Sequence, residues 1–152
     1  MLGWERFART APEIANAGLR LLGNSELAFL ATVSKSGRPR IHPFVPKVVR
    51  GRLVAFIIDS SPKIKDLQYR KQYSIHTLPG PEDEECFLSG EATECYSENE
   101  FRLEAATAMG FVTGVDEHHI LYEFFLDRAL WTRWLDFGTA DHRAQHSRWA
   151  LD

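Results

Sequence analysis

The chain has 152 residues, of which 44% are hydrophobic and 26% are charged, as expected for a globular protein that buries a core. A net charge of -3 gives no overall attraction to nucleic acid, and no apolar run has the length of a membrane span or the core of a signal peptide. The two cysteines, Cys86 and Cys95, are too few for a disulfide framework. We therefore expect a cytoplasmic protein with reduced thiols and with no nucleic-acid or membrane partner.

The N-terminal part of the chain changes from a helical to a strand-like pattern. Apolar residues at helical spacing predict a helix over residues 10–22, with Thr10 as its N-cap and Gly23 as its C-cap. The run 27–33 is rich in strand-forming residues and ends at the turn Ser34–Gly37. This run is expected to open a barrel that continues to about residue 135 and is followed by a polar tail, 136–152.

Further strands and two helices are expected after this turn. The predicted strands cover residues 40–49, 53–58, 73–78, 86–96 and 120–135, and the predicted helices cover residues 61–70 and 98–109. Pro43 and Pro46 mark the first of these strands as an edge or a bulge. Together with residues 27–33 this makes six strands, so we expect a small antiparallel barrel or sandwich with flanking helices, in one domain over residues 1–152.

The chain leaves the buried strand 53–58 through two serines, and two lysines then follow two residues apart. A helix N-terminus presents unpaired backbone N–H groups, and Ser61, Lys63 and Lys65 could add a hydroxyl and positive charge to hold a phosphate. On spacing alone, a serine N-cap with solvated lysines is the favoured interpretation. Arg38 and Arg40 favour the anion site, because we place them on the strand that pairs with residues 53–58.

Histidine and tryptophan residues in the second half suggest weaker sites. His118, His119, His142 and His146 lie outside any zinc-binding motif, so no metal site is predicted. Trp131, Arg133 and Trp134 are typical of a core or subunit interface first and of a stacking surface second. In a regular strand, Trp131 and Arg133 share one face and Trp134 lies on the other, so Trp134 is expected in the core.

Residues 27–95 resemble the FMN-binding split β-barrel proteins, the pyridoxamine 5′-phosphate oxidase-like superfamily. The resemblance is carried by an ordered series of short motifs: Leu30–Val33, Gly37–Arg40, Ile41–Pro43, Gly51, the strand 53–58, the group Ser61, Lys63, Asp66 and Leu67, and the strand motif Leu88–Ala92. The likeness is looser over the helix from Glu98 and the strand that reaches Trp134. It implies a six-stranded antiparallel split β-barrel with Greek-key connections.

The resemblance also implies a site that two subunits share. It assigns the FMN phosphate to Arg40 and to the turn of Ser61, Pro62 and Lys63. It assigns the flavin ring to Ile41, His42, Pro43, Phe56, Ile57 and Ile58, with His42 as the best candidate to face the ring. Trp131 and Arg133 are the candidates to reach the cofactor of the partner in a homodimer.

The function implied is that of an FMN-dependent oxidoreductase acting on an unidentified small molecule, with no catalytic side chain assigned. The flavin carries the chemistry in such a site, while the protein orients and desolvates it. A deazaflavin F420-dependent reductase is an alternative that the acidic loop 79–85 disfavours, and a non-catalytic flavin- or haem-binding protein is another. The C-terminal Arg-x-His segment of the true oxidase has no counterpart here, so oxidation of vitamin B6 is not expected.

Overall fold

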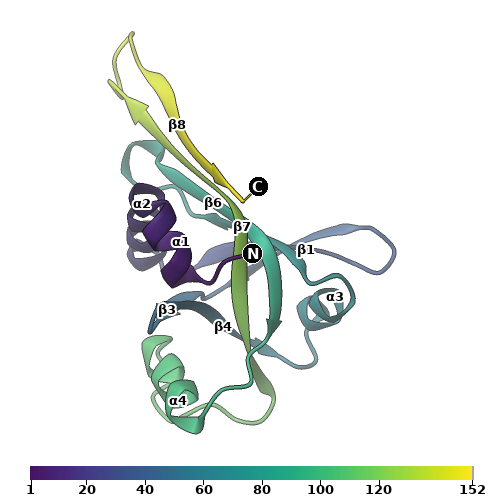
Figure 1. Ribbon diagram of the computed structural model, residues 1–152. Coiled ribbons are helices and arrows are strands. Elements are labelled where there is room, and N and C mark those ends of the chain that lie inside the picture. Colours follow the sequence, from purple (N-terminus) through teal and green to yellow (C-terminus); the bar gives the residue numbers. More distant parts are fainter. Residues whose placement is uncertain (152) are drawn as a thin grey trace.

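The structure is a computed structural model that describes residues 1–151. Its elements, in chain order, are α1 (Trp4–Thr10), α2 (Pro12–Asn24), β1 (Ala28–Val33), β2 (Pro39–Phe44), β3 (Lys47–Val49), β4 (Arg52–Ile58), α3 (Pro62–Arg70), β5 (Gln72–Thr77), the 3-10 turn η1 (Pro81–Asp83), β6 (Glu85–Glu94), α4 (Asn99–Ala108), β7 (His119–Leu135) and β8 (Arg143–Ala150). Figure 1 shows the curved sheet, with α1 and α2 on one side and α3 on the other.

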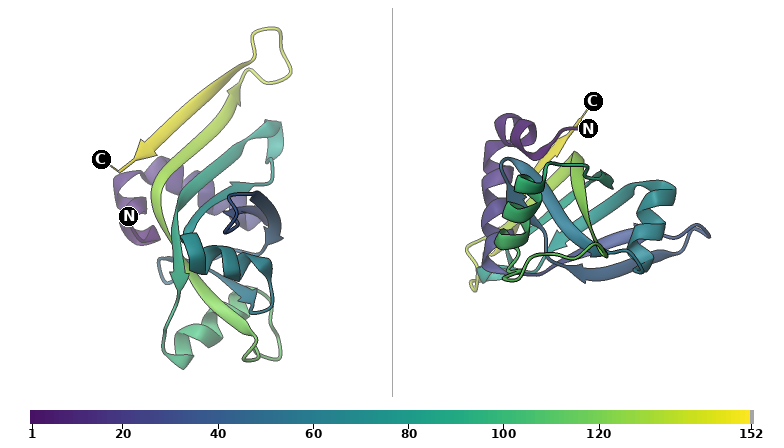
Figure 2. Two further views of the ribbon diagram at one scale, coloured as in Figure 1. Left: turned by 90° about the vertical axis from the view of Figure 1, so that its right-hand side faces the viewer. Right: turned by 90° about the horizontal axis from the view of Figure 1, so that it is seen from below.

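The eight strands form one antiparallel sheet in the order β2-β1-β5-β6-β7-β4-β3, and β8 pairs with β7 outside this path. The 17-residue strand β7 pairs with β4 in its first part, with β6 along most of its length, and with β8 in its last part. Beyond the barrel, β7 and β8 continue as a two-stranded ribbon (Figures 1 and 2). The barrel and the ribbon therefore share one long strand.

The barrel interior is the main hydrophobic core. Leu30, Ile75, Leu88 and Phe124 are fully buried, one each from β1, β5, β6 and β7. The N-terminal helices cover one side of the barrel, where Phe7 of α1 and Leu21 of α2 are buried within the same core. None of the helices in residues 1–151 is long and apolar enough to cross a membrane.

The mainly β fold with flanking helices is confirmed, but several predicted elements differ. The predicted helix 10–22 corresponds to α2, but Ala11 is its N-cap and Ser25 its C-cap in place of Thr10 and Gly23, and the preceding helix α1 was not predicted. The predicted strand 40–49 is divided around Pro46 into β2 and β3, and the predicted tail 136–152 contains β8. The sheet therefore has eight strands instead of six.

The pairing expected for Arg38 and Arg40 is also wrong. Strand β2 pairs with β1, where Arg40 lies opposite Thr32, whereas β4 pairs with β3 and β7. Arg40 nevertheless lies near α3, because α3 packs on β1 and carries Asp66, whose carboxylate is 3.4 Å from the Arg40 guanidinium. The basic strand and the serine turn meet through this helix.

Candidate functional site

The turn from β4 into α3 forms one side of the candidate site. Ser61 is the N-cap of α3, and its hydroxyl accepts a long hydrogen bond of 3.4 Å from the backbone N–H of Lys63. Pro62 occupies the first helical position, where its missing N–H costs no hydrogen bond. The nine-residue helix directs the positive end of its dipole at this turn. The predicted start of this helix is confirmed. Basic residues of β2 lie near it.

Basic side chains of β2 lie beside this helix start. Arg40 and His42 share the inner face of β2, since residues two apart in a strand point to the same side. The Nε2 atom of His42 is buried and has no hydrogen-bond partner within the described chain. Burial lowers the pKa of His42, and the positive charge of Lys63 lowers it further. Burial alone lowers the pKa of Lys63. Two nitrogen groups that would gain from an anion therefore lie close together.

Arg40 is held in place by a buried carboxylate. Asp66 of α3 is 4% exposed, and one of its oxygens accepts a 2.8 Å hydrogen bond from the Thr32 hydroxyl. Its other oxygen lies 3.4 Å from Arg40. This contact fixes the position of the Arg40 guanidinium. The Arg40 side chain is still 41% exposed, so it remains accessible to a ligand.

An apolar cavity of about 300 Å³ opens next to Lys63. It is lined by residues of four segments: Pro43, Phe44, Val45, Phe56, Ile57, Ile58, Ser61, Lys63, Met109, Phe111 and His119. The rings of Phe56 and Phe111 meet edge to face with their centroids 5.6 Å apart. A mainly apolar cavity with a cationic end suits a planar ligand that carries an anionic group.

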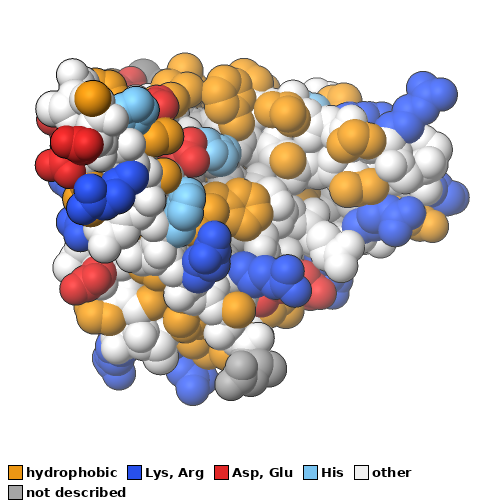
Figure 3. All heavy atoms as spheres, turned by 90° about the horizontal axis from the view of Figure 1, so that it is seen from above, with side chains coloured by type: hydrophobic (Ala, Val, Ile, Leu, Met, Phe, Trp, Pro, Cys, Tyr) orange, Lys and Arg blue, Asp and Glu red, His pale blue; other side chains and the backbone are white. Residues whose placement is uncertain are grey.

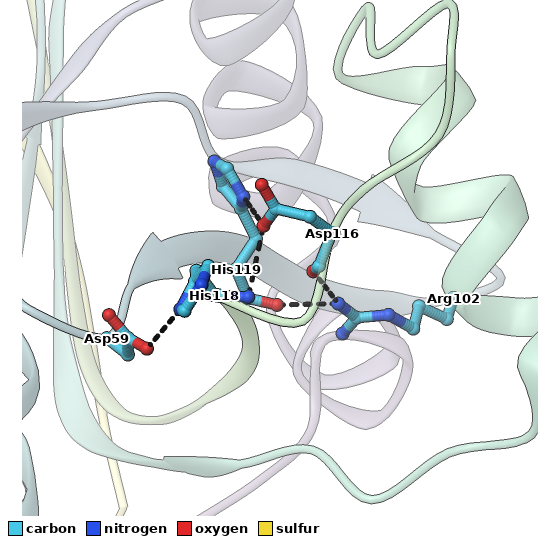
Figure 4. Close-up of polar contacts among 5 residues, drawn as sticks. All are labelled: Asp59, Arg102, Asp116, His118 and His119. Carbon is cyan, nitrogen blue, oxygen red and sulfur yellow. Dashed lines mark hydrogen bonds and ion pairs between the residues drawn. The ribbon is translucent and has the colours of Figure 1, made fainter.

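His119 brings a hydrogen-bonded carboxylate–imidazole pair to this cavity. Its Nδ1 atom lies 2.6 Å from a carboxylate oxygen of Asp116, and Figure 4 shows the two side chains facing each other. This contact assigns the proton to Nδ1, which leaves Nε2 as the free ring nitrogen. The same contact lowers the pKa of Asp116. The pair can therefore accept or donate a proton at Nε2.

The neighbouring His118 has a different role. Its Nδ1 atom lies 2.8 Å from a carboxylate oxygen of Asp59, and the Asp59 backbone N–H donates to the His118 carbonyl. These contacts join the turn that follows β4 to the turn that precedes β7. This contact raises the pKa of His118. Arg102 of α4 donates to the carbonyls of Asp116 and His119 (Figure 4). Its guanidinium also lies 5.0 Å from the centroid of the Phe56 ring. These contacts hold His119 in place.

The predicted site residues are only partly gathered around the cavity. Pro43, Phe56, Ile57, Ile58, Ser61 and Lys63 line it, and Arg40 and His42 lie next to its cationic end. Ile41 does not line it, because it lies on the outer face of β2 and is 70% exposed. Sequence reasoning did not place Phe111 and His119 in this site. His119 reaches it through the register of β7 against β4, in which it lies opposite Ile58, and Phe111 of the loop after α4 packs on the Phe56 and His119 rings. No metal-binding group of three or more His, Cys, Asp or Glu occurs in residues 1–151.

Trp131 and Arg133 lie at another place in the molecule. They line a second cavity of about 460 Å³ beside α2, together with Arg20. The Arg133 guanidinium lies 4.9 Å over the Trp131 ring, so the two residues form the expected unit. The Trp131 indole donates a 2.7 Å hydrogen bond to Glu84, which also binds Arg20 at 2.6 Å. Whether this unit reaches the cofactor of a partner subunit stays a prediction.

Trp134 is not a core residue, contrary to the prediction. It is partly exposed and packs on the His142 ring, with the ring centroids 5.6 Å apart. The reason is that β7 has already left the barrel at this point and forms the ribbon with β8, so no second layer covers it.

No protein-family model matches the sequence, and no curated protein is similar to it in sequence. Solved structures do match. A Clostridium acetobutylicum protein related to general stress protein 26, of the pyridoxinephosphate oxidase family, has a TM-score of 0.67 at 10% identity, over 92% of this chain and 95% of its own. A pyridoxamine 5′-phosphate oxidase-related, FMN-binding protein from Nostoc punctiforme has a TM-score of 0.62 at 14% identity, over 93% and 96%.

A haem-binding protein from Mycobacterium smegmatis also matches, with a TM-score of 0.62 at 16% identity. The match covers 85% of this chain but only 57% of that protein. Similar structures thus include proteins named for FMN and for haem. At these identities the likeness establishes the fold alone. The chain has the split-barrel fold of the pyridoxamine 5′-phosphate oxidase-like proteins.

Proposed function

We propose that the protein binds FMN in the cavity between β4, β2 and the loop after α4. The observation that carries this proposal is the unpartnered, buried Nε2 atom of His42 beside the desolvated amine of Lys63. A buried polar atom without a partner is costly, and an anionic oxygen would satisfy it. The FMN phosphate is such an anion, and the adjoining apolar cavity suits its ring system.

The chain's own residues fit the parts of this cofactor. Lys63, Arg40 and the Ser61 hydroxyl at the start of α3 would hold the phosphate, and His42 would donate to it when protonated. Phe56 and Phe111 would exclude water from the ring. Bound FMN would supply hydride or electron transfer to a small molecule. His119, oriented by Asp116, would hold or release a proton at Nε2 for the substrate.

We propose further that the functional unit is a homodimer with the cofactor at the interface. Phe29 pairs with Pro43, and Ala31 with Ile41, so these side chains form one apolar face of the β1–β2 hairpin. Phe29 is 43% exposed and Ile41 is 70% exposed. An exposed apolar face beside an open cavity favours a second subunit as its cover. Sedimentation equilibrium tests this proposal, and a monomer that binds FMN tightly would refute the shared site.

Haem is the second candidate, because His119 lines the cavity with its Nδ1 held by Asp116, so its imidazole could bind the iron. The F420 alternative differs from FMN in its deazaflavin ring and in the tail beyond its phosphate. The absorbance spectrum of protein purified without added cofactor distinguishes flavin, deazaflavin and haem. If the purified protein shows a haem spectrum and His119→Ala abolishes it, haem replaces FMN as the proposed cofactor. The cytoplasmic location expected from the two free thiols stays a prediction.

A further inference from the structure

The segment that joins α4 to β7 forms one wall of the candidate cofactor cavity. The segment and its ends contribute Met109, Phe111 and His119 to the lining, whereas the rest of the lining comes mainly from β2, β4 and the start of α3. The Phe111 ring packs edge to face on Phe56, with the centroids 5.6 Å apart, and on His119, with the centroids 5.4 Å apart. Residues 110–116 take no part in strand pairing, so this wall can move while the barrel stays intact.

The size of the cavity gives a reason for such a movement. Its volume is about 300 Å³. Cavities that bind small molecules usually have roughly 300–1,000 Å³, so this one lies at the lower limit. The fused ring system of a flavin therefore has little room beside the Phe111 ring. The walls that belong to β2 and β4 are fixed by strand pairing, which leaves the Phe111 wall as the side that can yield.

Two glycines allow the backbone of this segment to change conformation. Gly110 and Gly114 have φ angles of +83° and +88°, and a Cβ atom added to either would meet nothing within 4 Å. Packing therefore does not fix these two positions, and glycine can adopt other backbone conformations there. Val112, which lies between them, is 97% exposed. The backbone hydrogen bond from the Gly114 N–H to the Phe111 carbonyl is long, at 3.5 Å.

Arg102 of α4 ties the far end of the segment down. It donates hydrogen bonds of 3.0 Å to the Asp116 carbonyl and 2.6 Å to the His119 carbonyl (Figure 4), and its guanidinium lies 5.0 Å from the centroid of the Phe56 ring. Within the described part of the chain, no other Lys or Arg forms a side-chain hydrogen bond or ion pair with residues 110–118. In Figure 3, many of the Lys and Arg side chains gather at the right-hand end of the molecule, where the β1–β2 hairpin projects. Arg102 is therefore the basic contact whose loss should free the segment.

We propose that residues 110–116 form a lid that opens to admit the cofactor and closes behind it, with Gly110 and Gly114 as its hinges. Arg102 is the positioning residue that holds the lid closed. It does not line the cavity, so it acts on the ligand through the lid. The proposal rests on the FMN site proposed above and adds the regulation of that site, because the lid sets how fast the cofactor enters and leaves.

The first test measures FMN association and dissociation by stopped-flow flavin fluorescence, in the natural protein and in Arg102→Ala. A lid that must open for entry and for exit limits both steps. Loss of its latch should therefore raise both rate constants by the same factor, about fivefold to twentyfold, and change the Kd by less than about twofold. Arg50→Asn is the matched control, because the Arg50 guanidinium binds Glu100 and Glu104 of α4 but no residue of the lid, and Asn tolerates its left-handed backbone.

The second test needs no ligand. Phe111 is half-buried while the lid is closed, so chymotrypsin should cleave after Phe111 when the lid opens. Cofactor-free Arg102→Ala should be cleaved there faster than the natural protein, and saturation with FMN should slow the cleavage of both. Arg102→Lys keeps a donor that can reach one carbonyl at a time, so its rates should be intermediate. This variant carries both tests if Arg102→Ala does not fold.

The outcomes separate the lid from the proposed function. If Arg102→Ala raises only the dissociation rate constant and weakens FMN accordingly, Arg102 supports the site without gating it, and the lid proposal is wrong while the FMN site stands. The same conclusion follows if neither rate constant changes more than in Arg50→Asn. If the natural protein does not bind FMN, the proposed function fails and cleavage after Phe111 decides on the lid. A cleavage rate that Arg102→Ala does not raise then overturns it.

Discussion

Two regions of the molecule use the same kinds of residue to different ends. Beside α2, the aromatic ring of Trp131 and the guanidinium of Arg20 both bind Glu84, so each polar group has a partner. Beside α3, His42 Nε2 is buried without a partner, and burial lowers the pKa of Lys63 with no carboxylate to offset it. Aromatic and basic residues alone do not indicate a binding site. Unsatisfied polar groups next to an apolar cavity distinguish the second region from the first.

The largest effect is expected where the barrel passes into the ribbon. Gly90 lies at the register shift between β6 and β7, and a Cβ atom there would lie 1.9 Å from the Phe125 carbonyl oxygen. Gly90→Ala should lower the free energy of unfolding by at least about 3 kcal/mol, because the clash is with backbone. Urea denaturation measures it. Gly114→Ala is the control at an open position with strained backbone, and equal losses in both variants would show that the clash is relieved.

The paired region should matter for stability and not for the cofactor. Glu84→Ala leaves the Trp131 N–H without its acceptor, so we expect a loss of about 2 kcal/mol in unfolding free energy with unchanged FMN affinity. The hydrogen bond from Arg20 lowers the pKa of Glu84 below 4.5. The stabilisation is therefore complete above pH 4.5 and is lost as pH falls through the folded-state pKa. The difference in unfolding free energy between Glu84→Ala and the natural protein should therefore shrink in acid. If Glu84→Ala changes the affinity for FMN, Glu84 belongs to the FMN site.

The unpaired region should make the stability of the cofactor-free protein depend on pH nearer to neutrality. Burial lowers the pKa of His42 below 6.5, so the unfolded chain takes up this proton more readily, and the cofactor-free protein should lose stability as pH falls through 6.5. The loss should be smaller than that caused by Glu84→Ala, and His42→Leu should remove it. Thermal unfolding between about pH 5.5 and 7.5 measures this. An unchanged pH dependence in His42→Leu would assign the loss to another group.

The smallest effect concerns the two thiols. Burial raises the pKa of Cys86 to about 12, whereas Cys95 is half-buried and accepts a hydrogen bond from Arg52. In native protein at about pH 8, we expect a thiol reagent to modify Cys95 and to leave Cys86 unmodified until unfolding. Mass spectrometry of the two peptides identifies the modified residue. Modification of Cys86 in folded protein would mean that the helix α2 opens from the barrel.

Local patterns predicted much of the barrel. Strands β1, β4, β5 and β6 carry the apolar residues and turn signals of half-buried strands, and Ser61 with Pro62 marks the start of α3. The final strand was missed because its residues are mainly polar and exposed, as is common in a strand at the edge of a sheet. Its apolar partner residues are in β7, and the sequence of β8 by itself does not reveal that pairing.

The site was harder to predict than the fold, because it depends on pairing between distant segments. The serine turn and Lys63 could be recognised locally, since a helix start has its own signals. His119 could not, because only the register of β7 against β4 places it opposite Ile58. The strand pairing expected for Arg40 was incorrect, although the family resemblance also assigned Arg40 to the site, and Asp66 of α3 holds it there.

The most direct test of the central claim, that His42, Lys63 and the start of α3 hold a phosphate, compares FMN with riboflavin. Lys63→Ala should weaken FMN by about 1.5–3 kcal/mol, the scale of a charge-assisted hydrogen bond, and leave riboflavin, which lacks the phosphate, nearly unchanged. Lys71→Asn should alter neither ligand. If Lys63→Ala weakens FMN and riboflavin equally, or weakens neither, the phosphate does not bind at this helix start and the account is wrong.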